Sequence, residues 1–235
     1  MTPLPPAVPL QLPIEGGDPV SALLQVPADA AAVFVLAHGA GAGMHHPFLA
    51  ALAAELARRG VATLRYQFPF IERGSKRPDQ PATAHTAVRA AVALAGQRCA
   101  GLPLLAGGKS YGGRMTSQAQ ALSPMPGVAG LVLVGFPLHP AGKPGVERAQ
   151  HLQQVHCPLL FLQGTRDELA DLTLLRPVLQ PLGALATLQV IEGADHGFAV
   201  RGAGRAKSEP ALPMAAVLAG LIAGWLSTLP ARAAG

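Results

Sequence analysis

Ser110 carries the strongest chemical signal in the sequence, because it stands between glycines in the motif Gly108-Lys109-Ser110-Tyr111-Gly112. An apolar, strand-like run precedes the motif, and a helix-like segment follows it. A serine on such a sharp strand-to-helix turn is exposed, and glycines two positions away relieve the crowding of the turn. The pattern therefore indicates a nucleophilic serine.

Two nucleotide-binding motifs compete with this interpretation. Gly108-Lys109-Ser110 could end a phosphate loop, G-x-x-x-x-G-K-[ST], but the first glycine would fall on Pro103 and the residues between are strand-like. A dinucleotide loop in the segment "HGAGAGMHH" also fails, since its third glycine would be Met44 or His46. A nucleotide-binding α/β protein is therefore only a lesser alternative.

A nucleophilic serine needs a base that accepts its proton. Four histidines follow Ser110, and only His196, in "VIEGADHGF", comes after the last predicted strand. His139 follows an earlier strand, whereas His151 and His156 precede a strand and so belong to its other end. Because open α/β sheets place their sites at the carboxyl ends of strands, we predict His196 as the base.

An acid is needed to orient this histidine, and "LLFLQGTRDELA" offers Asp167, Glu168 and Asp171. Asp167 follows the strand after a short turn, so it can reach over the end of the sheet, whereas the other two belong to the next helical region. Asp195 is next to His196 in sequence, where side chains diverge, and it could shape the loop. We predict Asp167 as the acid.

An oxyanion hole requires two backbone N–H donors. The first is expected from Tyr111, the residue after the nucleophile. The second is expected from the loop after the first central strand, where Ala40 is the first choice and Gly41 the second.

Three histidines border this loop, at His38, His45 and His46. No H-x-x-x-H spacing and no nearby carboxylate accompanies them, so we expect loop packing, with no metal and no cofactor. Lys109, His45, His46 and Arg73 could nevertheless favour an anionic substrate.

Strand-like and helix-like segments alternate along the chain, which predicts an α/β fold with a mostly parallel central sheet and helices on both faces. Residues 1–30 read as a Pro-rich lead-in with a possible edge strand, and residues 31–235 as a single domain. The stretch from His139 to Cys157 is too short for a large cap domain. The predicted strands are 31–39, 61–69, 102–108, 127–137, 157–164 and 186–193, and the predicted helices are 47–60, 81–96, 112–123, 175–183 and a terminal helix.

Composition narrows the class of protein. Half of the 235 residues are hydrophobic and 13% are charged, which is typical of a globular chain with a large core. The formal charge of +5 comes without long basic runs, so no nucleic-acid partner is expected. Two well-separated cysteines and an N-terminus without a basic, then apolar, leader favour a cytoplasmic location.

One apolar stretch could suggest a membrane span. Residues 210–230 carry no charge and approach the length that a span requires. Pro213, many alanines and the polar pair Ser227 and Thr228 argue against it. We predict a buried terminal helix that covers the sheet, and no membrane partner.

Taken together, "HGAGAGMHHPF", "RYQFPF", "GGKSYGGRM", "GFPLHPAGKP", "LFLQGTRDEL" and "GADHGF" resemble the α/β-hydrolase superfamily. They are most similar to a small, lid-less branch near dienelactone-hydrolase-like and testis-expressed hydrolase-like proteins, which also includes a chromatin-complex scaffold subunit. The resemblance covers about residues 31–198 and implies the same triad: Ser110, Asp167 and His196. Lys109 is a departure, because many esterases carry an uncharged residue there.

The predicted function is a serine hydrolase that cleaves an ester bond of a small-molecule acyl substrate. The alternative from a different class is a non-enzymatic interaction module on the same fold. The sequence leaves the acyl group and the oligomeric state open.

Overall fold

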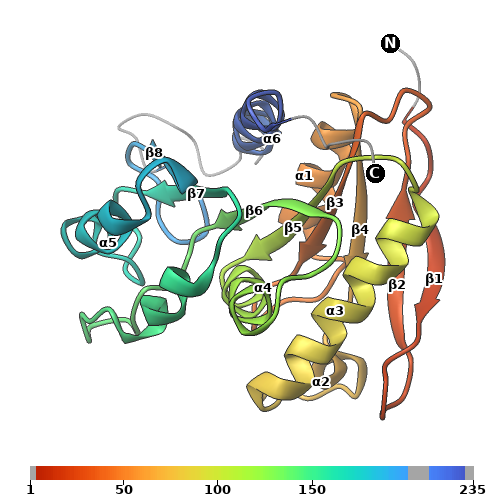
Figure 1. Ribbon diagram of the computed structural model, residues 1–235, viewed down its shortest axis with the longest axis horizontal. Coiled ribbons are helices and arrows are strands. Elements are labelled where there is room, and N and C mark those ends of the chain that lie inside the picture. The colour runs from red at the N-terminus through yellow and green to blue at the C-terminus, as the bar shows by residue number, and fades with distance from the viewer. Residues whose placement is uncertain (1–3, 201–211, 231–235) are drawn as a thin grey trace.

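A computed structural model describes residues 4–200 and 212–230, which form an eight-stranded sheet. The strand order is β1-β2-β4-β3-β5-β6-β7-β8, and every pairing from β4 to β8 is parallel (Figure 1). The strands are β1 (Val8–Leu12), β2 (Val20–Gln25), β3 (Ala32–Ala37), β4 (Val61–Tyr66), β5 (Leu104–Lys109), β6 (Val128–Val134), β7 (Leu159–Gly164) and β8 (Ala186–Ile191).

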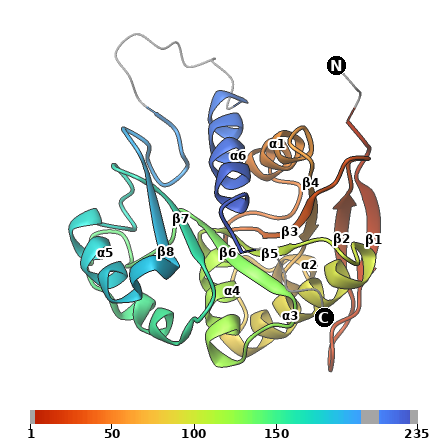
Figure 2. The same ribbon diagram turned by 45° about the horizontal axis from the view of Figure 1, so that its top comes forward.

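Helices cover both faces of this sheet, as the sequence predicts. Helices α1 (Pro47–Ala57) and α6 (Leu212–Leu226) lie side by side on one face (Figures 1 and 2). The other face carries α2 (Pro69–Glu72), α3 (Pro81–Arg98), α4 (Tyr111–Leu122) and α5 (Leu172–Leu179), together with the 3₁₀ segment η1 (Glu147–Gln154). A second 3₁₀ segment, η2 (Gln180–Leu185), leads into β8.

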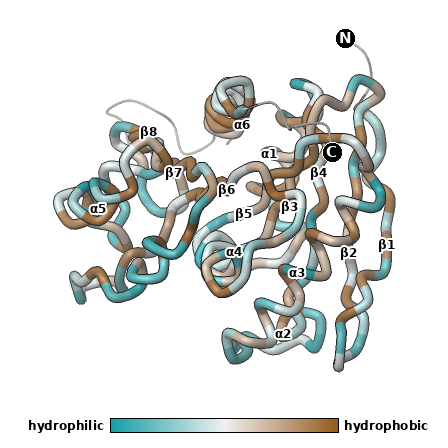
Figure 3. Tube along the Cα trace, viewed as in Figure 1, coloured by the Kyte–Doolittle hydropathy of each residue, from teal (hydrophilic) through white to brown (hydrophobic). Residues whose placement is uncertain are grey.

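The central strands are mostly apolar because they are buried on both faces. All six residues of β3, β4 and β7 are buried. Figure 3 shows the hydrophobic colour following these central strands, while polar residues collect in the peripheral loops. The core is thus two apolar layers, one on each side of the sheet.

The N-terminal lead-in contributes more than the single edge strand considered from sequence. β1 and β2 form an antiparallel pair, and β2 in turn pairs with β4. Ala22 and Leu12 are almost fully buried, so the segment is part of the same sheet. The many prolines of this segment argued against strands in the sequence. In the structure they lie beside the strands or on the edge strand, where a missing N–H is tolerated.

The chain after β4 also differs from expectation. The strand predicted to reach residue 69 ends at Tyr66, and Pro69 begins the short helix α2, where a proline fits the first turn. The helix predicted to end at Gly96 continues to Arg98.

The apolar C-terminal stretch forms α6, which packs on α1 and the sheet through residues that include Leu218, Ile222 and Trp225. Residues 210 and 211 of the predicted run lie outside the described residues. Among the described helices, none has the length and apolarity needed to cross a membrane.

Candidate active site

Ser110 alone connects β5 to α4, at the centre of the sheet. Its backbone is in a positive-φ conformation (φ 51°, ψ −114°) that a residue with a side chain rarely adopts. The Ser110 N–H donates to Val134 O (2.9 Å), and the Arg114 N–H donates to Ser110 O (3.1 Å). The strained turn is therefore fixed from both sides. Residues 104–109, which a phosphate loop would need, form the strand β5 instead.

The flanking glycines are required by close approach of backbone to backbone. A Cβ at Gly108 would lie 2.2 Å from Ala37 O, and one at Gly112 would lie 2.6 Å from His38 O. Both distances are far below any real Cβ contact, so the glycines let α4 and β5 pack directly against the end of β3.

The three residues predicted as nucleophile, base and acid lie within hydrogen-bond distance of one another. Ser110 Oγ is 2.9 Å from His196 Nε2, and His196 Nδ1 is 2.9 and 2.8 Å from the two carboxylate oxygens of Asp167. Asp167 is buried, while His196 and Ser110 are partly exposed. A neutral imidazole with its proton on Nδ1 fits this arrangement, since Nε2 can then accept the serine proton.

Asp167 is held by two further donors. The Leu169 N–H donates to its Oδ1 (2.8 Å), and the Gln163 side-chain amide donates to its Oδ2 (2.6 Å). Sequence reasoning did not single out Gln163. Its signal was present, because it is the one polar side chain in the buried strand "LLFLQG" and such groups need a partner.

The loop that carries His196 is shaped by its neighbours. The Asp195 carboxylate accepts the Ala199 N–H (2.9 Å) and does not contact the imidazole. Phe198 has a positive φ of 63°, and its buried ring stacks on Phe48 at the start of α1 (5.9 Å between centroids). Asp195 and Phe198 thus fix the path of the loop and the direction of His196.

The two predicted oxyanion donors border Ser110. Tyr111 is the first residue of α4, and a Cβ at Gly39 would lie 3.8 Å from the Cβ of Ser110, which places the following Ala40 next to the nucleophile. Within the part of the chain that the structure describes, neither the Tyr111 N–H nor the Ala40 N–H donates a hydrogen bond. Both donors are thus free to bind a ligand oxygen.

His38 is fully buried and forms a structural link behind this loop. Its Nδ1–H donates to Gly39 O (2.7 Å), and its Nε2 accepts the Phe68 N–H (3.0 Å). Burial lowers the pKa of His38 to about 4, partly offset by the Gly39 hydrogen bond, so the imidazole is neutral. His45 is exposed, and His46 caps α1 by accepting the Phe48 N–H. Among the described residues, no three His, Cys, Asp or Glu side chains cluster as metal ligands.

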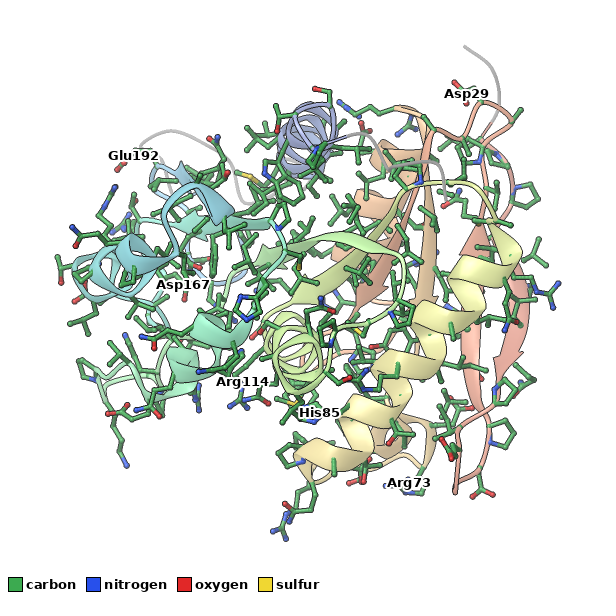
Figure 4. The ribbon with its side chains drawn as sticks, in the orientation of Figure 1. Asp29, Arg73, His85, Arg114, Asp167 and Glu192 are labelled. Carbon is green, nitrogen blue, oxygen red and sulfur yellow. The ribbon has the colours of Figure 1, made fainter. Side chains whose placement is uncertain are left out.

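The basic residues considered for an anionic substrate are spread apart. Arg73 pairs with Asp79 (2.5 Å) and lies on the opposite side of the molecule from Asp167 (Figure 4). The Lys109 ammonium lies over the Phe198 ring, 5.5 Å from its centroid. His45, His46, Arg73 and Lys109 therefore do not form one cluster around Ser110.

Within the part of the chain that the structure describes, no cap domain covers the site. Between β6 and β7, the only helical segment is η1, so residues 135–158 form no cap domain. A hollow of about 350 Å³ borders His196 and is lined by Arg166, Glu168, Asp195 and nearby small residues. Ser110 itself does not line this hollow.

A mainly parallel sheet with a strained serine between its central strand and helix, facing a histidine from the loop after the last strand, defines an α/β-hydrolase. The chain belongs to this family: the model described as "Alpha/beta hydrolase domain" matches residues 30–221. The resemblance and the fold class inferred from sequence are thereby confirmed.

Solved structures of hydrolases have the same fold. The chain is similar to a dienelactone hydrolase from Anabaena variabilis (TM-score 0.76, 20% identity, covering 97% of this chain and 100% of that one). It is also similar to an α/β serine hydrolase without lid from Xanthomonas campestris (TM-score 0.71, 20% identity, 99% and 100%). A serine hydrolase homologue from Coxiella burnetii gives a TM-score of 0.73 at 17% identity, covering 96% and 100%.

Proposed function

We propose that the protein is a serine hydrolase that cleaves esters of small or exposed acyl groups through Ser110, His196 and Asp167. Family membership supports hydrolase chemistry in general. The observation that carries the specific proposal is the continuous chain of hydrogen-bond contacts from Ser110 Oγ through the imidazole to the buried carboxylate. Core packing alone does not require a histidine to contact a strained, accessible serine, whereas catalysis by a triad does.

The reaction requires only water as a co-substrate. Ser110 Oγ bonds to the carbonyl carbon while its proton passes to His196 Nε2, and the amides of Tyr111 and Ala40 stabilise the oxyanion. The C–O bond to the alcohol then breaks, and the alcohol leaves with the proton from His196. A water molecule gives a proton to His196 and attacks the acyl-enzyme, which releases the acid and returns the proton to Ser110.

The open surface favours substrates with a short acyl group or one that projects into solvent. Among the described residues, no cap domain encloses Ser110, and Ser110 does not line the hollow beside His196. A short, activated, neutral ester is therefore the appropriate first substrate.

The experiment that tests this function is covalent labelling with a neutral fluorophosphonate, followed by mass spectrometry of the adduct. We expect one label per chain, on Ser110, and ester hydrolysis that is lost in step with labelling. Ser110→Ala should lower kcat by on the order of 10⁴-fold or more without unfolding the chain. Ser123→Ala, which changes an exposed serine at the end of α4, is the matched control and should retain both the labelling of Ser110 and the rate. A label elsewhere, or more than a tenth of the rate in Ser110→Ala, would contradict the proposal.

A further inference from the structure

Lys109 places a charged group inside the candidate site, directly before Ser110 on β5. Its ammonium lies over the ring of Phe198. A Cβ at Gly135 would lie 3.0 Å from Lys109 Nζ, 3.3 Å from the Phe198 ring and 3.6 Å from Asp167 Oδ2. The ammonium, the aromatic ring and the carboxylate of the acid therefore converge on one point at the end of β6, where a glycine leaves space.

This is an unfavourable place for a cation. Lys109 follows Leu105 by four residues on the strand, so it points to the same face, into the apolar layer under α1 and α6 that includes Phe198. Burial lowers the pKa of Lys109 to about 8, while the nearby carboxylates of Asp167 and Asp195 act in the opposite direction. Among the described ion pairs, Lys109 forms none within 4.0 Å of a carboxylate.

The surroundings nevertheless attract the ammonium to the two loops that carry the acid and the base. Asp167 comes from the loop after β7, and Asp195 precedes His196 in the loop after β8. The ring of Phe198, which follows His196 in the loop after β8, adds a cation–π contact with the ammonium. Because Lys109 is covalently next to Ser110, these attractions connect the nucleophile turn to both loops.

We propose that Lys109 is a positioning residue of the reaction, whose ammonium fixes the Asp167 carboxylate and the His196 loop with respect to Ser110. This role rests on the proposed hydrolase function. It also gives a reason for a cation at a position that is costly for stability, since buried groups with shifted pKa values concentrate at functional sites.

The role has a specific pH signature. Lys109 is charged below about pH 8 and neutral above it, so the wild-type kcat should fall above pH 8 toward the value of the uncharged variant. Stability should respond in the opposite direction. The folded state holds the Lys109 proton less tightly than the unfolded chain, so between about pH 8 and the ordinary 10.5 the free energy of unfolding should gain a stabilising contribution.

The test compares Lys109→Met, Lys109→Arg and Lys143→Met, a control that removes an exposed lysine charge from a loop. For a neutral activated ester, we expect Lys109→Met to lower kcat by about tenfold with KM little changed, because misplacement of the catalytic groups affects the chemical step. Lys109→Arg should recover kcat to within about threefold and lose the decline above pH 8. Urea unfolding at pH 7 should show Lys109→Met to be no less stable than the wild type.

Fluorophosphonate labelling separates this proposal from the function on which it rests. A wild type that neither labels nor turns over ester overturns both. A wild type that labels at Ser110, with Lys109→Met unchanged in kcat and pH profile, overturns the role of Lys109 alone. Equal kcat in Lys109→Met and Lys109→Arg would assign the effect to shape, and a loss of stability that matches the loss of rate would assign it to folding. Either result also overturns the proposal.

Discussion

The histidines of this chain show how hydrogen-bond partners decide the role of one side-chain type. In both His38 and His139, the Nδ1–H donates to the carbonyl of the next residue, and Nε2 accepts a backbone N–H from another loop. Both ring nitrogens are therefore occupied in holding loops together. His151 contacts the Ser117 hydroxyl (2.8 Å), but that serine is buried and donates to Arg114 O. His196 contacts an accessible serine, which makes it the candidate base.

Asp167 and Asp195 provide a prediction at this scale, because both flank His196 and only Asp167 contacts the imidazole. We expect Asp167→Asn to lower kcat by up to about 10⁴-fold, since an amide at this position favours the wrong imidazole tautomer. Asp195→Asn should be mild, because its amide oxygen can still accept the Ala199 N–H. Steady-state kinetics of the two variants with one ester gives the ranking, and the reverse order would identify Asp195 as the acid.

At the scale of elements, the candidate site depends on β3, β5 and α4 approaching one another more closely than side chains permit. The turn at Ser110 is held by Val134 O of β6 and by the first helical hydrogen bond of α4. The acid and the base come from the loops after β7 and β8, and the Phe198 ring anchors the last loop to α1. Segments that are distant in sequence therefore act together to set one distance, that between Ser110 Oγ and His196 Nε2.

Gly112 tests this packing. Gly112→Ala should reduce the free energy of unfolding by roughly 1–3 kcal/mol and lower the rate of Ser110 labelling, because the new Cβ would overlap His38 O and Ala37 Cβ. Gly224→Ala is the matched control, since it lies on an exposed helical position of α6 with no atom within 4 Å. That change should stabilise the fold by about 0.5–1 kcal/mol. Urea unfolding checks both signs, and equal effects in the two variants would contradict the close-packing account.

At the scale of the whole molecule, the fold has one apolar layer on each face of a single sheet, and hydrogen bonds from buried polar side chains connect its loops and helices. His38 joins the loop after β3 to the start of α2, and His151 joins η1 to α4. Their neutral forms are part of the structure: burial is the main cause that lowers the pKa of each to about 4, and the Arg114 and His85 charges lower that of His151 further. The stability of the whole domain is therefore linked to pH.

Acid should destabilise the protein in a defined window. The folded pKa of His38 and of His151 is below the ordinary 6.5, so the contribution of the neutral forms is complete above pH 6.5 and is lost as pH falls toward 4. For His38 alone, the loss is on the order of 3 kcal/mol. Urea unfolding between pH 7.5 and 4 measures it, and His151→Gln should make the decline shallower. A free energy of unfolding that stays constant from pH 6.5 to 4.5 would contradict this prediction.

Local pattern determined much of this protein by itself. The alternation of apolar runs with helices predicted an α/β fold with a mostly parallel sheet, and the glycine spacing around Ser110 predicted a nucleophile turn, because such signals depend only on neighbours along the chain. The lid-less α/β-hydrolase branch was what the resemblance of the quoted motifs implied. The choice of Ser110, Asp167 and His196 also followed from sequence, through the rule that strand ends share one edge of the sheet. Their roles remain a proposal.

Only the tertiary structure decided what depends on contacts between distant segments. β1 and β2 join the sheet because β4 offers a partner edge, which no local pattern encodes. Gln163 and Phe198 support the site from a buried strand and a strained loop, and their importance appears only when Asp167 and Phe48 come into contact with them. From the sequence, Lys109 was considered only as a basic residue next to the nucleophile that could favour an anionic substrate. Its ammonium lies among Phe198 and two carboxylates because the fold brings three strand ends together, and a sequence lists neighbours in the chain rather than in space.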